Sequence, residues 1–198
     1  MTRTTIGLTA AAIAVGGAFA VKREETRALD RAVRRRIHPR RSKRVTRMAK
    51  GISSLAEPHV HPLVAAVLGL LLRIDRGRGG LAPGAASLAA LGVDNAMRLF
   101  VHQRRPPKAG PHHALHRYAY PSGHTTAATA IAVAVAAEFD DGLSRDQQIA
   151  LWSGVAAIAI AVGWSRLYLD EHWLDDIVGG WMAGTVIGLA AASLEERY

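Results

Sequence analysis

The sequence predicts an all-α membrane protein that crosses the bilayer several times, and three observations support this fold class. Of the 198 residues, 49% are hydrophobic and only 6% are aromatic, which is typical of helices rich in small and aliphatic residues. The apolar residues gather in six stretches separated by short polar segments. The formal charge of +9 is concentrated in residues 22–50, which hold 13 Lys/Arg and 3 Asp/Glu, so the remaining residues sum to −1. We therefore expect a helical bundle with about six transmembrane helices and one basic, amphipathic interfacial helix.

The first apolar stretch covers residues 4–21 and carries no charge. A membrane-spanning helix needs about 20 apolar residues, so this stretch is long enough for a span that stays in the protein. The alternative is a cleaved signal peptide, because Arg3 precedes the stretch and Ala18-Phe19-Ala20 resembles a cleavage site.

The basic segment, residues 22–50, places Leu29, Val33 and Ile37 at four-residue spacing among its cationic residues. Such a helix can lie among lipid headgroups and bind anionic lipid. A solvated loop that obeys the positive-inside rule is the alternative. Nucleic acid is not expected as a partner, because the segment has no aromatic residue to stack on bases.

Five further apolar stretches follow, at residues 60–74, 81–101, 125–139, 149–164 and 177–194. Several are only fifteen to eighteen residues long, so their ends must reach water or thin the bilayer locally. Gly180, Gly184 and Gly188 predict close helix packing in the last stretch. We expect an N-terminal part at residues 1–59 and a helical bundle at residues 60–198, within a single domain.

If the spans alternate in direction, the loops at residues 102–124 and 165–176 emerge on the same face of the membrane. The second loop is highly polar although it lies between two apolar stretches. Charged groups at the edge of a low-dielectric layer are costly unless they pair with one another or with a ligand. This location therefore predicts a functional site.

The residues of these loops suit a phosphate group. Arg98, Arg105 and Arg166 offer planar, permanently charged guanidinium groups that can bind two oxygens at once. Ser122 and Gly123 precede an apolar stretch, so their backbone N–H groups face an anion at a helix N-terminus.

His172 and Asp176 are four residues apart and share one face of a helix that begins near them. The carboxylate can then hold one imidazole nitrogen while the other is free to attack. For Arg98 a simpler alternative exists, because Asp94 is four residues away and an ion pair between them neutralises both charges.

These motifs resemble the type 2 phosphatidic acid phosphatase family of membrane lipid phosphatases, whose fold also occurs in vanadium haloperoxidases. The family pattern is Lys-x6-Arg-Pro, then Pro-Ser-Gly-His, then Ser-Arg-x5-His-x3-Asp. The second block is present as Pro121 to His124, and the third as Ser165-Arg166, His172 and Asp176. In the first block Arg98 replaces the family lysine, which keeps the charge but changes reach and geometry.

The resemblance implies a mechanism without a metal or other cofactor. His172 attacks phosphorus to form a phosphohistidine, His124 acts as general acid and then as general base, and Asp176 orients His172. Arg98, Arg105, Ser122, Gly123 and Arg166 are expected to bind the phosphate oxygens.

Three alternatives remain at this stage. A haloperoxidase would hold vanadate in the same pocket, but that resemblance is to soluble enzymes. A non-catalytic protein that binds anionic lipid would explain the basic segment and leave the three motifs unexplained. A zinc site at His112, His113 and His116 is disfavoured because no carboxylate lies near them in the loop.

The positive-inside rule places the basic segment, and with it the site, on the cytoplasmic face. Frequent Ala, Arg and Gly suggest a GC-rich bacterial genome and hence a bacterial plasma membrane. Candidate substrates are phosphatidic acid, phosphatidylglycerophosphate, polyprenyl pyrophosphate and a polyprenyl-linked sugar phosphate, since each presents a phosphate at the headgroup plane.

Overall fold

The computed structural model describes residues 24–37, 42–76, 80–107 and 118–195. Within these ranges the chain forms seven α-helices and, apart from one isolated antiparallel bridge between Arg104 and Tyr118, no β-structure. The all-helical prediction is confirmed. The helices are α2 (Glu24–Ile37), α3 (Lys43–Ser54), α4 (His61–Arg76), α5 (Ala82–Phe100), α6 (Gly123–Asp140), α7 (Arg145–Tyr168) and α8 (Leu174–Glu195).

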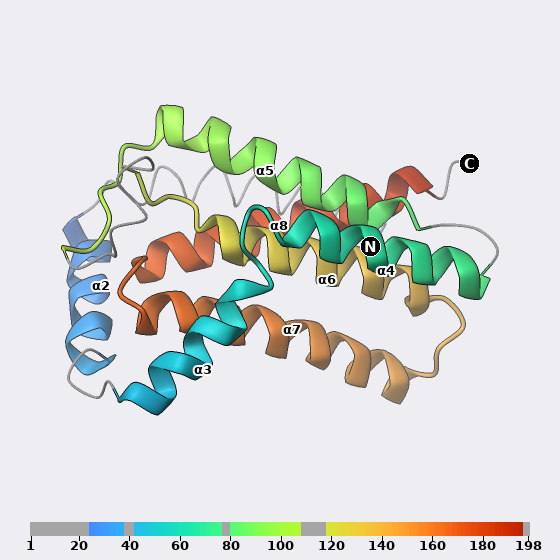
Figure 1. Ribbon diagram of the computed structural model, residues 1–198, viewed down its shortest axis with the longest axis horizontal. Coiled ribbons are helices and arrows are strands. Elements are labelled where there is room, and N and C mark those ends of the chain that lie inside the picture. The colour runs from blue at the N-terminus through green and yellow to red at the C-terminus, as the bar shows by residue number, and fades with distance from the viewer. Residues whose placement is uncertain (1–23, 38–41, 77–79, 108–117, 196–198) are drawn as a thin grey trace.

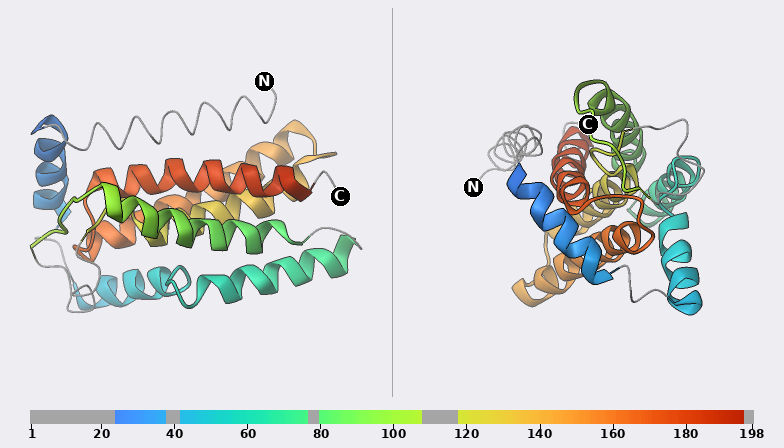
Figure 2. Two further views of the ribbon diagram at one scale, coloured as in Figure 1. Left: turned by 90° about the horizontal axis from the view of Figure 1, so that it is seen from above. Right: turned by 90° about the vertical axis from the view of Figure 1, so that its left-hand side faces the viewer.

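Helices α4 to α8 run along the long axis of the molecule, and α2 lies across one end of them (Figures 1 and 2). Helix α6 packs against α5, α7 and α8 and forms the centre of the bundle. The core is built largely of alanine side chains from α5, α6 and α8, which lets the helix backbones approach closely. The loops that follow α5 and α7 therefore reach the same end of the bundle.

The glycines of α8 pack against α6, as their spacing predicts. A Cβ atom on Gly184 would lie 2.6 Å from the carbonyl oxygen of Thr126, and one on Gly188 would lie 2.6 Å from the carbonyl oxygen of Ala130. A side chain at either position would push the two helices apart. The expected close packing in this stretch is confirmed.

The count of six spans is not confirmed. Among the described residues, two helices are long and apolar enough to cross a bilayer, α7 and α8. Helices α4, α5 and α6 coincide with the predicted apolar stretches, but the sixteen residues of α4 cover only about 24 Å. The first predicted stretch, residues 4–21, lies outside the described residues.

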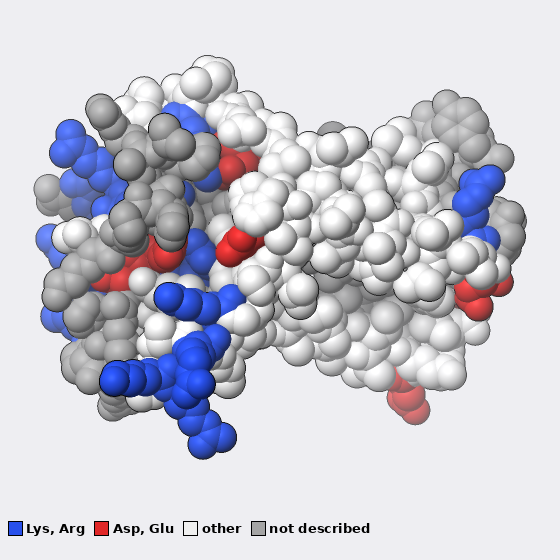
Figure 3. Space-filling view, in the orientation of Figure 1, with Lys and Arg blue, Asp and Glu red and all other residues white. Residues whose placement is uncertain are grey.

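Charged side chains are distributed unevenly over the surface. In the view of Figure 3 most Lys and Arg side chains gather at the end that carries α2 and α3, and the middle of the molecule is almost free of charge. A belt without charge next to a cationic end is typical of a protein that sits in a bilayer with that end among the headgroups.

The basic segment forms two helices instead of the single one that we expect from its sequence. Helix α2 ends at Ile37 and α3 begins at Lys43. Pro39 lies in the sequence between them, and a proline inside a helix costs about 3 kcal/mol. Ser42 caps α3, since its hydroxyl accepts the Val45 N–H at 3.2 Å.

Candidate active site

The loop after α5 and the loop between α7 and α8 meet at the end of the bundle near α2. The Gln103 amide donates a hydrogen bond to Asp176 Oδ1 at 3.0 Å, and the Trp173 indole N–H donates to the Arg104 carbonyl at 2.8 Å. The backbone N–H of Ser122 donates to the Asp176 carbonyl at 3.0 Å. The bonds made by the Gln103 and Trp173 side chains join residues that are 73 and 69 positions apart in the chain.

His172 and Asp176 form a buried pair at the start of α8. His172 Nδ1 lies 3.2 Å from Asp176 Oδ2, and the same oxygen accepts the Trp173 N–H at 2.9 Å. Asp176 is 0% exposed and His172 is 4% exposed. The four-residue spacing therefore brings the carboxylate to the imidazole as predicted, and the Trp173 and Gln103 donors hold the carboxylate in place.

The contacts of His172 define its tautomer. Its Nε2 lies 3.0 Å from an Nη1 atom of Arg105, and a guanidinium can only donate. Nε2 must therefore accept with its lone pair, so the proton of the neutral ring is on Nδ1 and points at Asp176. This arrangement leaves on Nε2 the electron pair that a nucleophile requires.

The electrostatic surroundings of His172 keep its ring neutral. Burial lowers the pKa of His172 well below its usual value near 6.5, and the positive charge of Arg105 lowers it further. Arg166, His124 and Arg98 act in the same direction. All four groups therefore lie close enough to His172 to change its titration, although they come from α5, α6, α7 and the loop after α5.

Arg105 has a second contact in the loop before α8. Its Nη1 also donates to the Glu171 carbonyl at 2.9 Å. Burial and the neighbouring Arg98 lower the pKa of Arg105 to about 10, so the group remains cationic at neutral pH. Its guanidinium thus lies between the backbone of this loop and His172 Nε2.

Arg166 is buried at the end of α7 and binds two partners that its motif does not reveal. One nitrogen donates to the Ser53 hydroxyl of α3 and another to the Glu171 carboxylate. Its Nε is buried and has no acceptor among the described residues. A buried guanidinium N–H without an acceptor is costly, and a phosphate oxygen would satisfy it.

Arg98 forms the ion pair with Asp94 that the sequence offers as an alternative. The distance between Nη2 and Oδ2 is 2.7 Å, and Nε and Nη2 both contact Oδ1. Its Nη1, however, is buried and has no acceptor among the described residues. The ion pair and an anion-binding role are therefore compatible, because Asp94 holds one edge of the guanidinium and leaves an N–H on the other.

The start of α6 fits against this ion pair. A Cβ atom on Gly123 would lie 2.9 Å from Asp94 Oδ2, so any larger residue at this position must displace the Asp94 carboxylate. Ser122 differs from the prediction, because its backbone N–H already bonds the Asp176 carbonyl instead of facing an anion. Its hydroxyl accepts from Thr125 at 3.0 Å and retains its own proton to donate.

Sequence reasoning missed several residues that support this site. Glu171, Gln103 and Ser53 bind Arg166 or Asp176, and Asp30 of α2 accepts the Asp175 N–H at 3.2 Å. No pattern marks them. Gln103, Ser53 and Asp30 contact partners that are distant in the sequence, and Glu171 is five residues from Arg166, which is not a spacing that places two residues on one helix face.

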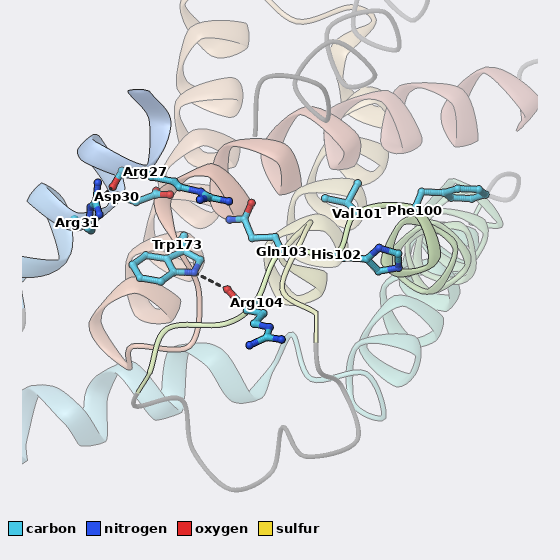
Figure 4. Close-up of a pocket in the computed structure, with 9 residues that line it drawn as sticks. All are labelled: Arg27, Asp30, Arg31, Phe100, Val101, His102, Gln103, Arg104 and Trp173. Atoms are coloured by element: carbon cyan, nitrogen blue, oxygen red, sulfur yellow. Dashed lines mark hydrogen bonds between the residues drawn. The ribbon is translucent and has the colours of Figure 1, made fainter. Parts of the chain in front are cut away.

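A cavity of about 600 Å³ lies beside the site (Figure 4). It is lined by Arg27, Asp30, Arg31, Phe100, Val101, His102, Gln103, Arg104 and Trp173. None of the eight predicted site residues lines it. The cavity touches the site through Gln103, which bonds Asp176, and through Trp173, which follows His172.

The histidines considered for zinc, His112, His113 and His116, lie outside the described residues, as do Lys108 and Arg117. Within the described part of the chain, no group of three or more His, Asp or Glu side chains could hold a metal ion.

Known structures share this fold. The chain superposes on a transmembrane PAP2-type phosphatidylglycerolphosphate phosphatase from Bacillus subtilis with a TM-score of 0.84, at 19% identity and over 96% of each chain. LpxE from Aquifex aeolicus gives a TM-score of 0.57 at 20% identity, over 86% of this chain and 96% of that one. The chain shares its fold with these two solved structures, and its helices α7 and α8 are long and apolar enough to cross a bilayer.

A sequence relative is the putative undecaprenyl-diphosphatase YbjG of Escherichia coli (strain K12). It is 44% identical over 43 residues, which cover 21% of this chain and 22% of that protein. The family match is much longer, since residues 80–197 match the PAP2 superfamily and include all three motifs. On the strength of that match, which extends over more than half of its length, the chain belongs to the PAP2 superfamily.

Proposed function

We propose that this protein is an integral-membrane lipid phosphatase, which hydrolyses a phosphomonoester or diphosphate of a lipid through a phosphohistidine intermediate. One observation carries the proposal. The neutral His172, with its lone pair on Nε2, lies among the guanidinium groups of Arg98, Arg105 and Arg166. Family membership supports the same chemistry.

In the free enzyme Arg105 covers the lone pair of His172 Nε2. An arriving phosphate offers Arg105 a charged acceptor, and a charge-assisted bond to phosphate is roughly twice as strong as one to a neutral group. Arg105 then moves from the imidazole to a phosphate oxygen. Substrate binding thereby exposes the nucleophile.

In the first step Nε2 attacks phosphorus in line with the bond to the leaving oxygen. The N–P bond forms as the P–O bond breaks, and His124 gives its proton to the departing lipid alkoxide or phosphate. Asp176 stabilises the positive charge that develops on the ring through its bond to Nδ1–H. The products are the dephosphorylated lipid and a phosphohistidine.

In the second step His124, now neutral, takes a proton from a water molecule. The resulting hydroxide attacks phosphorus, the N–P bond breaks, and its electron pair returns to Nε2. Inorganic phosphate leaves and both histidines regain their initial protonation states.

The oxygens that carry charge in both transition states need donors. The buried Nη1 of Arg98 and the buried Nε of Arg166 have no acceptor among the described residues and are suited to this role. Arg105, the Ser122 hydroxyl and the Gly123 amide complete the expected set. Because these donors exist before the substrate arrives, little reorganisation is needed during the reaction.

The substrate is proposed to present its phosphate at the headgroup plane with its tail in the bilayer. The structural relative from Bacillus subtilis is named for phosphatidylglycerolphosphate, and the relative from Escherichia coli for undecaprenyl diphosphate. Phosphatidate- and polyprenyl-type lipids are therefore the classes to test. The basic helices α2 and α3 are proposed to contact anionic lipid on the same side, and their charge favours the cytoplasmic face.

Phosphate release from purified protein tests the proposal, with phosphatidate, phosphatidylglycerophosphate and a polyprenyl diphosphate as substrates. His172→Ala should abolish release, whereas the exposed His59→Ala should have no effect. Rapid quenching with labelled substrate should trap a protein-bound phosphate that is stable in alkali and labile in acid. Normal turnover in His172→Ala would refute the mechanism.

The proposed side is tested by a reporter fused after Tyr198. Helix α8 leads away from the site end of the bundle (Figure 2), so a cytoplasmic site requires the reporter to lie outside the cytoplasm. A reporter found in the cytoplasm would show that the site faces the opposite side of the membrane.

A further inference from the structure

The cavity beside the active site lies on the side of Asp176 and away from the reactive nitrogen. Gln103 lines the cavity and bonds Asp176 Oδ1, while Asp176 Oδ2 bonds His172 Nδ1. Nδ1 and Nε2 point in roughly opposite directions from the imidazole ring. A molecule in the cavity therefore lies on the Asp176 side of the His172–Asp176 pair, so it is not the phosphate that His172 Nε2 attacks.

The lining of the cavity is cationic. Arg27 and Arg31 come from α2, and Arg104 comes from the loop after α5. Figure 4 shows Arg27 extending from α2 toward Gln103, so a charged group reaches the side of the cavity next to the site. The single lining carboxylate, Asp30, is buried and accepts the Asp175 N–H. The cavity thus favours an anion, and guanidinium groups bind phosphate oxygens well.

The opposite edge of the cavity is apolar. Phe100 ends α5 there and Val101 follows it, and Phe100 is 74% exposed. Its neighbour Leu99 is 72% exposed, so the outer surface of this helix end suits acyl chains. Trp173 lines the cavity next to Arg104, and an indole is frequent at the boundary between lipid and water.

We propose that this cavity binds the phosphodiester headgroup of an anionic phospholipid that the enzyme does not hydrolyse. The arginines hold the phosphate and the acyl chains lie along the exposed end of α5. The inference rests on the membrane placement in the proposed function and does not depend on hydrolysis. The proposal also assigns the lipid contact of the basic segment to one defined cavity instead of to its whole cationic surface.

The site is connected to catalysis by two hydrogen bonds. Gln103 links the cavity to Asp176, and the Trp173 indole links the residue after His172 to the Arg104 carbonyl. A bound headgroup that orders Gln103 and Arg104 also orders the acceptor of the His172 proton. The lipid should therefore raise kcat more than it changes KM.

Binding is tested on full-length protein in a neutral detergent, by following the unfolding temperature while dioctanoyl-phosphatidylglycerol is added. Dioctanoyl-phosphatidylcholine, which has no net charge, is the reference lipid. Arg27→Gln/Arg31→Gln should weaken phosphatidylglycerol binding about tenfold or more. Arg104→Gln, on the other wall, should also weaken it.

The matched control is Arg35→Gln/Arg36→Gln, which removes the same charge from exposed positions of the same helix that do not line the cavity. This control should bind phosphatidylglycerol like the unchanged protein. Equal weakening in both double variants would show diffuse attraction to α2 and overturn the proposal, as would unchanged binding in Arg104→Gln. Equal protection by inorganic sulfate would overturn the lipid assignment.

A second measurement separates this inference from the proposed function. Phosphate release is measured in phosphatidylcholine with and without phosphatidylglycerol, which is a diester and not a phosphomonoester. Stimulation should be lost in Arg27→Gln/Arg31→Gln and kept in the control. Site-specific binding without any phosphatase activity would sink the proposed function and leave the lipid site standing. Normal hydrolysis without site-specific phosphatidylglycerol binding would refute the lipid site and leave the proposed function intact.

Discussion

Arg34 of α2 binds Asp170 with two parallel hydrogen bonds, from Nε to Oδ1 at 2.7 Å and from Nη2 to Oδ2 at 2.8 Å. Asp170 is 2% exposed and has a φ of 64°, which is the left-handed conformation that favours glycine. It lies between the end of α7 and His172. A basic helix that the sequence assigns to the membrane surface therefore also holds the loop that carries the proposed nucleophile.

The first prediction concerns this ion pair. Arg34→Gln removes two charge-assisted bonds from a buried carboxylate and should lower the free energy of unfolding by about 2–3 kcal/mol. Asp170→Gly should cost much less, because it removes the buried charge and relaxes the left-handed backbone. Chemical unfolding checks both variants, and the exposed Arg36→Gln is the control. Equal losses for the first two variants would contradict the argument.

The second prediction separates the roles of the buried pair. His172→Ala should lower kcat by about 10⁴-fold or more, because it removes the proposed nucleophile. Asp176→Asn should lower kcat by about 10² to 10³-fold, because the amide can favour the wrong imidazole tautomer while the nucleophile stays. Single-turnover kinetics give the comparison. A larger loss in Asp176→Asn than in His172→Ala would assign the attack to a different group.

The third prediction is the position of the acidic limb of the pH profile. His172 must be neutral to attack, and its surroundings lower its pKa well below 6.5, so kcat/KM should fall only at pH values below 6.5. Arg105→Gln removes a positive charge that contributes to this shift and should move the limb to higher pH. Arg36→Gln, which is remote from His172, should leave the limb in place. A shift to lower pH in Arg105→Gln would contradict this assignment.

The fourth prediction concerns the contact between α2 and α8. Burial, and the negative charge of Asp175, raise the pKa of Asp30 from 3.8 to about 6. Between these values the folded state binds more protons than the unfolded state, so stability falls as pH rises and stays lower above pH 6. Asp30→Asn keeps the acceptor oxygen without the charge. Its stability relative to the unchanged protein should therefore grow by about 1–2 kcal/mol from pH 4 to pH 7. If the free energy of unfolding of Asp30→Asn differed from that of the unchanged protein by the same amount at pH 4 and pH 7, this prediction would be wrong.

The fifth prediction tests the fit of Gly123 against Asp94. Gly123→Ala places a methyl group 2.9 Å from the carboxylate and should displace Arg98, which raises KM and lowers kcat. Gly92→Ala, in α5, is the matched control, because its new methyl group meets nothing within 4 Å. That variant should be as stable as the unchanged protein or more so by about 0.5–1 kcal/mol. Unchanged KM and kcat in Gly123→Ala would show that the size of this residue does not affect the position of Arg98.

Much of the fold and of the site follows from local sequence. The apolar stretches of the sequence coincide with α4 to α8, and the glycines of α8 predict its contact with α6. The four-residue spacing of His172 and Asp176 predicts their pairing because one helical turn brings such residues together. Alternating helix direction predicts that the two polar loops meet at one end.

Only the tertiary structure decided which groups complete that site. Glu171 binds Arg166, Gln103 binds Asp176, and Arg34 binds Asp170. Glu171 and Arg166 are close in the sequence, but no recognisable pattern marks their pairing. The other two join residues 73 and 136 positions apart. Helical periodicity constrains neighbours within a few turns, whereas such distant contacts depend on how whole helices pack and on where their ends lie. The polar side of α2 acquires its role only when that helix lies across the end of the bundle.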